Sequence, residues 1–279
     1  IGFGASGRNG GQVLGGFASE QDIYEKKFGM DLARQAFQIS LEGLDLLRER
    51  VRTHEIDCAL QEGAITVAIG ARKAASLRSW YEHMRDVYGY SALSWLDAQA
   101  VSNAVASERY CAGVRDAGGC HIHPLNYTLG LARAAQAAGV QIFEHSEVTR
   151  VSDRSQPGKV VVNTARGQVV AEHVVLAGNC TLPMDVVDSD APLGRGGLAR
   201  RIMPVGTWIV ATEQLGSERA ASLIPGGECV CDTQFVLDYF RVSEDQRMLF
   251  GGRVSYSQRA PRNLEKELRA CMERVFPKL

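Results

Sequence analysis

The chain opens with the glycine-rich stretch IGFGASGRNGGQ at residues 1–12, and the rest of the fold can be worked out from this stretch. Gly2, Gly4 and Gly7 have the spacing Gly-x-Gly-x-x-Gly, with which a strand-to-helix turn approaches the pyrophosphate of a dinucleotide. No apolar strand precedes these glycines in the sequence, and four further glycines by residue 16 disfavour a helix after them. We therefore reject the dinucleotide fingerprint for this stretch.

The same stretch has the composition of a ligand-binding loop. Ser6, Arg8, Asn9 and Gln12 place hydrogen-bond donors on a glycine-rich backbone, which suits an anionic or heteroaromatic ligand. The alternative interpretation is an ordinary surface loop without a ligand.

Composition places the chain among globular proteins. Its 279 residues are enough for one large domain or two smaller ones, and 45% hydrophobic residues exclude a disordered chain. Lysine plus arginine number 31 and aspartate plus glutamate 32, so the net charge of −1 does not favour nucleic acid or an anionic membrane as a partner. No apolar run approaches the roughly 18 residues that a membrane helix needs.

Seven cysteines stand at irregular spacing, and the odd number favours free thiols in a reducing compartment. We therefore expect a cytoplasmic protein. Only Cys229 and Cys231 are close together, and a structural zinc site would need a second pair. His121 and His123 alternate on an extended segment, but no further ligands stand at suitable spacing. The sequence predicts no metal site.

Apolar residues at helical spacing predict helices over residues 31–52, 73–88 and 264–275. Asp97 can cap a short helix that runs through Val101. Another helix should begin at Pro124, whose fixed φ suits the first turn, and end before Gly139.

Short runs of β-type sequence lie between and after these predicted helices. Cys58–Gln61 and Ala64–Ile69 predict a hairpin around Glu62 and Gly63. Val174–Ala177 is continuously apolar, which is typical of a parallel strand that is buried on both faces. An irregular connection is expected over residues 182–203. The remaining predicted strands are 140–144, 147–151, 159–165, 168–177, 207–212, 228–232, 235–242 and 247–251.

Residues 4–12 resemble the second flavin-contacting loop of the FAD-dependent amine and amino-acid oxidoreductases, the D-amino-acid oxidase-like superfamily. The chain looks most like the branch that contains gamma-glutamylputrescine oxidase. Further stretches resemble the family in the same order along the chain: GGCHIHP at 118–124, VVLAGN at 174–179, DYFR at 238–241 and RMLFGGR at 247–253.

The resemblance implies a mixed α/β fold with an incomplete FAD-binding, Rossmann-like domain and a mainly antiparallel β substrate domain. It assigns residues 1–60 and 120–203 to the FAD-binding domain, and residues 61–119 and 204–279 to the substrate domain. In the family, further segments of the FAD site would precede Ile1 and follow Leu279. We therefore expect the sequence to be part of a longer protein.

The resemblance also implies where FAD is held. The N-terminal loop would lie against the pyrophosphate and the ring, Gln12 would reach the ring edge, and the backbone of Val148 would meet the adenine. Ala177 and Gly178 would let the cofactor approach a strand end. The expected FAD-binding residues are Ser6, Arg8, Asn9, Gly10, Gly11, Gln12, Val148, Ala177 and Gly178.

Tyr239 and Arg241 share one face of a strand by their period of two. Together they can position the carboxylate or amide of an amine substrate, and the alternative is an exposed strand pair. His123, next to Pro124, is expected to be a structural element rather than a catalytic base.

The implied reaction is the oxidation of an amine or amino-acid derivative, with gamma-glutamylputrescine as the favoured substrate. The imine would hydrolyse to an aldehyde or oxo acid and ammonia, and oxygen would be reduced to hydrogen peroxide. Two alternatives stay open: a dehydrogenase of the same superfamily that passes electrons to a carrier, and a non-catalytic nucleotide-binding remnant. The oligomeric state is left open by the sequence.

Overall fold

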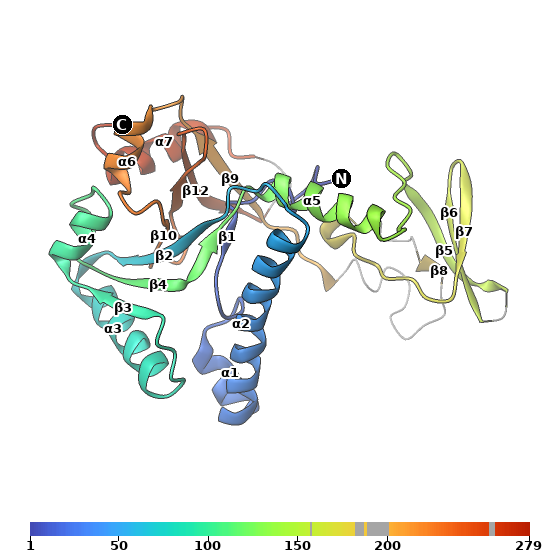
Figure 1. The fold of residues 1–279 in the computed structure, drawn as a ribbon, viewed down its shortest axis with the longest axis horizontal. Helices are drawn as coiled ribbons and strands as arrows, with labels where there is room; N and C mark the ends of the chain where they lie inside the picture. The colour runs from blue at the N-terminus through green and yellow to red at the C-terminus, as the bar shows by residue number, and fades with distance from the viewer. Residues whose placement is uncertain (157, 182–186, 189–200, 257–259) are drawn as a thin grey trace. The chain divides into compact units, whose positions relative to one another are not determined.

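The structure is a computed structural model that describes residues 1–156, 158–181, 187–188, 201–256 and 260–279 (Figure 1). The chain divides into two compact units. The larger unit contains residues 1–139, 207–254 and 261–279, and the smaller unit contains residues 140–206 and 255–260.

All the described α-helices belong to the larger unit. They are α1 (Gln21–Phe28), α2 (Met30–Thr53), α3 (Gly70–Asp86), α4 (Ala98–Ala104), α5 (Pro124–Ala137), α6 (Ser217–Leu223) and α7 (Leu264–Val275). The strands assigned to it are β1 (Gln12–Val13), β2 (Gln61–Ala68), β3 (Leu93–Leu96), β4 (Ala112–His121), β9 (Gly206–Ala211), β10 (Cys229–Asp232), β11 (Tyr239–Val242) and β12 (Met248–Ser255).

These strands form one curled sheet in the order β1-β4-β2-β10-β11-β12-β9, with β3 also paired to β4. Among the pairs whose register is described, only β2 and β10 run parallel. The sheet is therefore mainly antiparallel, and the predicted mixed α/β fold class is confirmed. This order brings the N-terminal β1 and the hairpin of β11 and β12 into one sheet, although more than 200 residues separate them.

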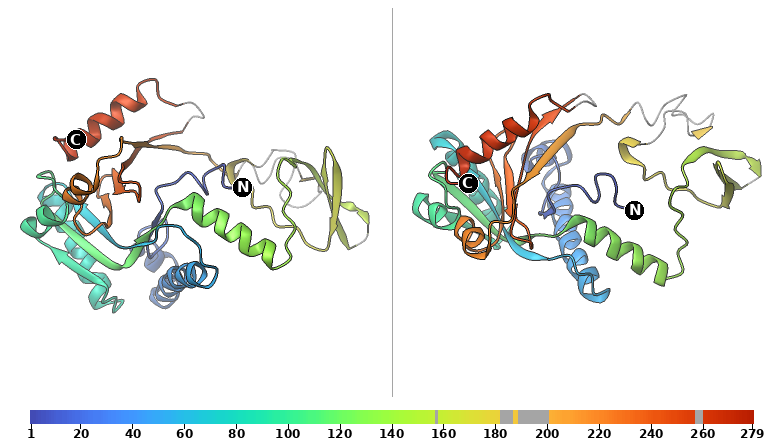
Figure 2. Two further views of the ribbon diagram at one scale, coloured as in Figure 1. Left: turned by 45° about the horizontal axis from the view of Figure 1, so that its top comes forward. Right: turned by 90° about the horizontal axis from the view of Figure 1, so that it is seen from above.

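Helices cover both faces of this sheet (Figures 1 and 2). On one face, α4, α6 and α7 enclose a core around Phe240. The ring centroid of Phe240 lies 5.5 Å from that of Phe250 and 5.3 Å from that of Phe276. On the other face, α2 and α3 contribute Phe37 and Leu77 to a second core. Successive residues of a strand point to opposite faces, so that β2 supplies both cores at once.

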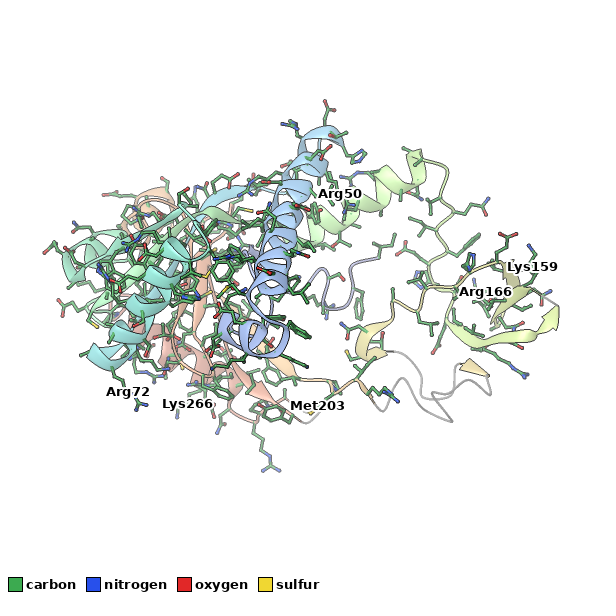
Figure 3. All side chains as sticks on the ribbon, turned by 90° about the horizontal axis from the view of Figure 1, so that it is seen from below. Arg50, Arg72, Lys159, Arg166, Met203 and Lys266 are labelled. Carbon is green, nitrogen blue, oxygen red and sulfur yellow. The ribbon has the colours of Figure 1, made fainter. Side chains whose placement is uncertain are left out.

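Charged side chains of the larger unit extend away from these cores. Arg50 on α2, Arg72 on α3 and Lys266 on α7 are exposed (Figure 3). None of the described helices is long and apolar enough to cross a membrane.

The smaller unit holds a four-stranded sheet in the order β7-β6-β5-β8. Among its described residues, Val151 and Val161 are buried and apolar. Lys159, labelled in Figure 3, forms an ion pair with Glu172 at 2.8 Å. Its elements are β5 (Val148–Gln156), β6 (Lys159–Thr164), β7 (Gly167–Ala171), β8 (Val187–Asp188) and a 3-10 helix (Asn179–Thr181).

The helices predicted from apolar spacing are confirmed. The Asp97 carboxylate accepts a hydrogen bond from the Ala100 N–H at 2.8 Å and so caps α4. Pro124 is the first residue of α5, and Gly139 follows that helix with φ +89°. The terminal helix has the predicted bounds, residues 264–275.

The predicted hairpin around Glu62 and Gly63 is wrong. β2 is one continuous strand, and its register against β4 shifts between Glu62 and Ala64. Gly63 has φ +96°, which forms a β-bulge rather than a chain reversal. A single glycine between two β-type runs gives the same sequence signal in both cases.

One strand predicted in the smaller unit does not form, and another is shorter than predicted. Residues 140–144 are irregular, with Phe143 66% exposed. The predicted strand 168–177 ends at Ala171 as β7, and the run Val174–Ala177 is irregular, with Val175 87% exposed. A buried strand needs a hydrogen-bonded strand on each side, and no described strand pairs with either run.

Most of the irregular connection predicted over residues 182–203 lies outside the described residues. The assignment of residue ranges to an FAD-binding and a substrate domain stays a prediction.

Candidate functional site

The N-terminal loop is held in shape by the side chain of Asn9. Its Nδ2 donates to the carbonyl oxygens of Ala5 at 2.9 Å and Ser6 at 3.2 Å, and its Oδ1 accepts from the Gly11 N–H at 2.8 Å. Within the described part of the chain, the N–H groups of Ser6, Asn9 and Gly10 make no hydrogen bond. The loop therefore presents free backbone donors on a fixed frame.

The loop also presents one cation. The guanidinium of Arg8 lies 4.2 Å from the centroid of the Phe3 ring, and both side chains are exposed. Gln12 lies at the start of β1, where its Nε2 donates to Cys231 Sγ at 3.6 Å.

Gly11 occupies a position where no side chain could fit, and Gly10 lies close to two side chains. A Cβ on Gly11 would lie 2.0 Å from the carbonyl oxygen of Ile122, and φ is +77° there. A Cβ on Gly10 would lie 2.6 Å from Gln12 Oε1 and 3.0 Å from the Tyr239 ring, so the Gln12 side chain would have to move. The two glycines thus let the loop backbone reach β11, at the point where Tyr239 and Arg241 stand.

Arg241 ties the loop to the sheet. It is 4% exposed, and it donates from Nε to the Gly10 carbonyl at 2.7 Å and from Nη2 to the Ile122 carbonyl at 3.1 Å. Burial lowers the pKa of its guanidinium, and no described carboxylate forms an ion pair with it. A buried cation with only neutral partners is costly, which makes Arg241 a natural partner for an anionic ligand.

Tyr239 lies on the same strand face, as its spacing from Arg241 predicts. Its ring fills the space above Gly251, whose added Cβ would meet the ring at 2.1 Å. Burial raises the pKa of the Tyr239 hydroxyl, so the phenol is neutral at physiological pH. The structure therefore brings Gly10, Gly11, Tyr239 and Arg241 together.

A cleft of about 480 Å³ lies beside this contact. Such a volume falls within the range of small-molecule sites. The N-terminal loop, the start of α5 and the β11–β12 hairpin line it, through Asn9, His123, Asn126, Arg241, Glu244 and Arg247 among others. The sequence did not single out the hairpin turn, although the polar run SEDQ at 243–246 between two strands is a turn signal.

The two histidines have different roles. His123 Nδ1 accepts a hydrogen bond from the Asn126 N–H at 3.3 Å, which caps α5. His121 is 3% exposed, and its Nε2 lies 2.9 Å from the Gly227 carbonyl. Burial lowers the pKa of His121 to about 4, so the ring is neutral and Nε2 donates this bond.

The stability of the larger unit should therefore decrease in mild acid. The folded-state pKa of His121 lies below the ordinary value of 6.5, so the stabilisation is complete above pH 6.5 and is lost as the pH falls towards 4. We expect the free energy of unfolding to decrease by about 2.5 kcal/mol between pH 7 and pH 4.5 because of the protonation of His121 in the unfolded state. Urea titrations of the wild type and of His121→Gln would measure the difference, and equal losses in both proteins would contradict it.

The remaining predicted FAD-binding residues belong to the smaller unit. Val148 begins β5 and pairs with Thr164. Gly178 precedes the 3-10 helix, and its carbonyl accepts from the Thr181 N–H at 3.0 Å, with exposed Ala177 beside it. Their role in binding FAD stays a prediction.

The family model described as "FAD dependent oxidoreductase" matches residues 1–279, and the chain belongs to this family. The expected FAD cofactor is thereby confirmed for the family.

Several curated relatives cover the whole chain. Gamma-glutamylputrescine oxidoreductase of Escherichia coli is 40% identical over 279 residues, which are 100% of this chain and 63% of that protein. A probable oxidoreductase, OrdL, of Haemophilus influenzae is 37% identical over 283 residues, which cover 100% of this chain and 62% of that protein. The chain thus spans less than two thirds of the length of these relatives.

Solved structures with the same fold share little sequence. Glycine oxidase of Geobacillus kaustophilus superposes with a TM-score of 0.66 at 21% identity, covering 99% of this chain and 69% of that one. L-α-glycerophosphate oxidase of Mycoplasma pneumoniae, solved with FAD bound, superposes with a TM-score of 0.68 at 16% identity, covering 98% and 69%. These likenesses support the fold alone.

Proposed function

We propose that the protein containing this chain oxidises an amine or amino-acid derivative with FAD. In the overall reaction the amine, oxygen and water give an aldehyde or oxo acid, ammonia and hydrogen peroxide, by way of an imine that water hydrolyses. The observation that carries the proposal is the contact of Gly10 and Gly11 with Arg241, because it joins the flavin-type loop to a buried cation beside a cleft.

The residues of the loop fit FAD. A pyrophosphate is bound by free backbone N–H groups and a nearby cation, and the loop offers the N–H groups of Ser6, Asn9 and Gly10 together with Arg8. Gly10 and Gly11 leave no side chain between the backbone and a flat ligand. Gln12, Val148, Ala177 and Gly178 complete the proposed FAD-binding set.

When bound, FAD supplies the acceptor for the hydride equivalent that leaves the carbon next to nitrogen. The residues of this chain orient the substrate. Arg241 binds a carboxylate or amide oxygen through its guanidinium, and Tyr239 adds a neutral hydrogen-bonding group on the same strand face.

Gamma-glutamylputrescine is the proposed substrate, because the E. coli relative at 40% identity is named for it. Oxygen is the proposed electron acceptor. The proposal also places the protein in the cytoplasm, which the seven free cysteines support.

An absorbance spectrum of the purified full-length protein tests the proposal. We expect the bands of oxidised flavin between about 300 and 550 nm, and their anaerobic bleaching by gamma-glutamylputrescine. Release of peroxide in air would identify an oxidase, whereas bleaching without peroxide would indicate the alternative, a dehydrogenase with a carrier. A protein that stays colourless after FAD is added would overturn the proposal in favour of a non-catalytic remnant.

A further inference from the structure

The cleft beside Arg241 has an uneven distribution of charge. Its titratable lining groups are His123, Arg241, Glu244, Asp245 and Arg247. The negative charge of Asp245 is already compensated within the chain. Its carboxylate accepts hydrogen bonds from Ser243 Oγ at 2.5 Å and from Arg247 Nε at 2.8 Å. These two bonds hold the pKa of Asp245 below its usual range.

Two charges in the cleft remain uncompensated. Arg241 is buried and donates only to backbone carbonyls. Glu244 is exposed, and its carboxylate has no hydrogen bond or ion pair with any described residue. The cleft therefore offers a fixed positive charge at a buried position and a negative charge at an exposed one.

The turn that carries Glu244 has a defined conformation. The Ser243 N–H donates to the Arg247 carbonyl at 2.9 Å, and the Gln246 N–H donates to the Ser243 carbonyl at 2.9 Å. Gln246 has φ +65°, so the turn closes the β11–β12 hairpin in the manner of a type I turn followed by a left-handed residue. Glu244 is thus held by the same hairpin as Arg241, three residues away.

We infer that this cleft selects substrates that carry both an anionic and a cationic group, with the carboxylate on Arg241 and an ammonium at Glu244. The inference rests on the proposed function for the identity of the cleft as the substrate site. Within that function it makes Glu244 a specificity residue: an amine with a second, non-reacting ammonium is preferred to one that lacks it. A ligand of one sign would leave one of the two charges without a partner.

Two amides whose butyl chain lacks the amine to be oxidised test the role of Glu244. γ-L-Glutamyl-n-butylamide carries a carboxylate and an ammonium, whereas the mono-n-butylamide of glutaric acid carries the carboxylate alone. Dissociation constants would be measured by calorimetry on the full-length, FAD-loaded protein, without turnover. We expect the wild type to bind the first amide about three- to fivefold more tightly, as for a partly exposed ion pair.

Glu244→Gln should abolish this preference and leave the affinity for the carboxylate-only amide unchanged. The matched control is Glu218→Gln, which removes the same charge from exposed α6, outside the cleft, and should keep the preference. A wild type without preference, or a Glu244→Gln variant that retains it, would overturn the inference. Failure of the proposed function would be seen separately, as a flavin that no amine bleaches while the binding preference persists.

Discussion

Replacing Gly11 with alanine is expected to cost about 3 kcal/mol of unfolding free energy and to release the flavin. The backbone at Gly11 has φ +77°, which costs an L-residue about 1–2 kcal/mol. The added methyl group would also lie 2.0 Å from the Ile122 carbonyl oxygen, which is backbone and cannot rotate away. Overpacking of this kind costs about 1–3 kcal/mol more.

Two other glycines separate these contributions. A Cβ at Gly16 would meet nothing within 4 Å although φ is +91°, so Gly16→Ala should show the backbone strain alone, about 1 kcal/mol. Gly4→Ala, in the same loop with open space and no positive φ, should change stability by less than about 0.5 kcal/mol. Urea unfolding measures the loss of stability, and flavin absorbance after gel filtration measures the loss of flavin. Equal losses in Gly11→Ala and Gly4→Ala would refute the role of the close contact between Gly11 and the Ile122 carbonyl.

Elements defined by local chemistry could be predicted from the sequence. α5 begins at Pro124 and α4 is capped by Asp97 because both signals act within one helical turn. α7 has the predicted bounds because its apolar stripe ends where Pro277 follows. None of these features depends on a distant part of the chain.

Features that depend on distant partners were predicted less well. An apolar run predicts a buried strand whether or not neighbouring strands exist, so the strand predicted over 168–177 includes Val174–Ala177, although β7 ends at Ala171. Gly63 gives the signal of a turn, yet β4, 50 residues further on, pairs with both sides of it and makes it a bulge. The resemblance supplied the loop and Arg241, but not Glu244, because a charged residue in a turn has no distinguishing sequence pattern.

Arg241→Met is expected to remove carboxylate binding while leaving the fold nearly intact. Methionine fills a similar length, and the loss of two hydrogen bonds to the Gly10 and Ile122 carbonyls is offset by release of a buried, unpaired cation. We expect unfolding free energy to change by less than about 1.5 kcal/mol. Affinity for the mono-n-butylamide of glutaric acid should fall more than about thirtyfold, since a buried partner of the carboxylate is lost.

Two further variants decide whether charge or geometry is responsible. Arg241→Lys retains a positive charge but replaces the planar guanidinium with a single ammonium group, which cannot bind two carbonyls and a carboxylate at once. The affinity of this variant should therefore lie between those of Arg241→Met and the wild type. Arg247→Met removes a cation that is already paired with Asp245 at 2.8 Å, and we expect less than about a fivefold loss of affinity. An Arg241→Met protein that is destabilised by several kcal/mol but binds the amide normally would assign Arg241 to the fold alone. We expect Arg241→Met to keep its stability but lose affinity, because no described carboxylate of the chain pairs with Arg241 and the ligand carboxylate does.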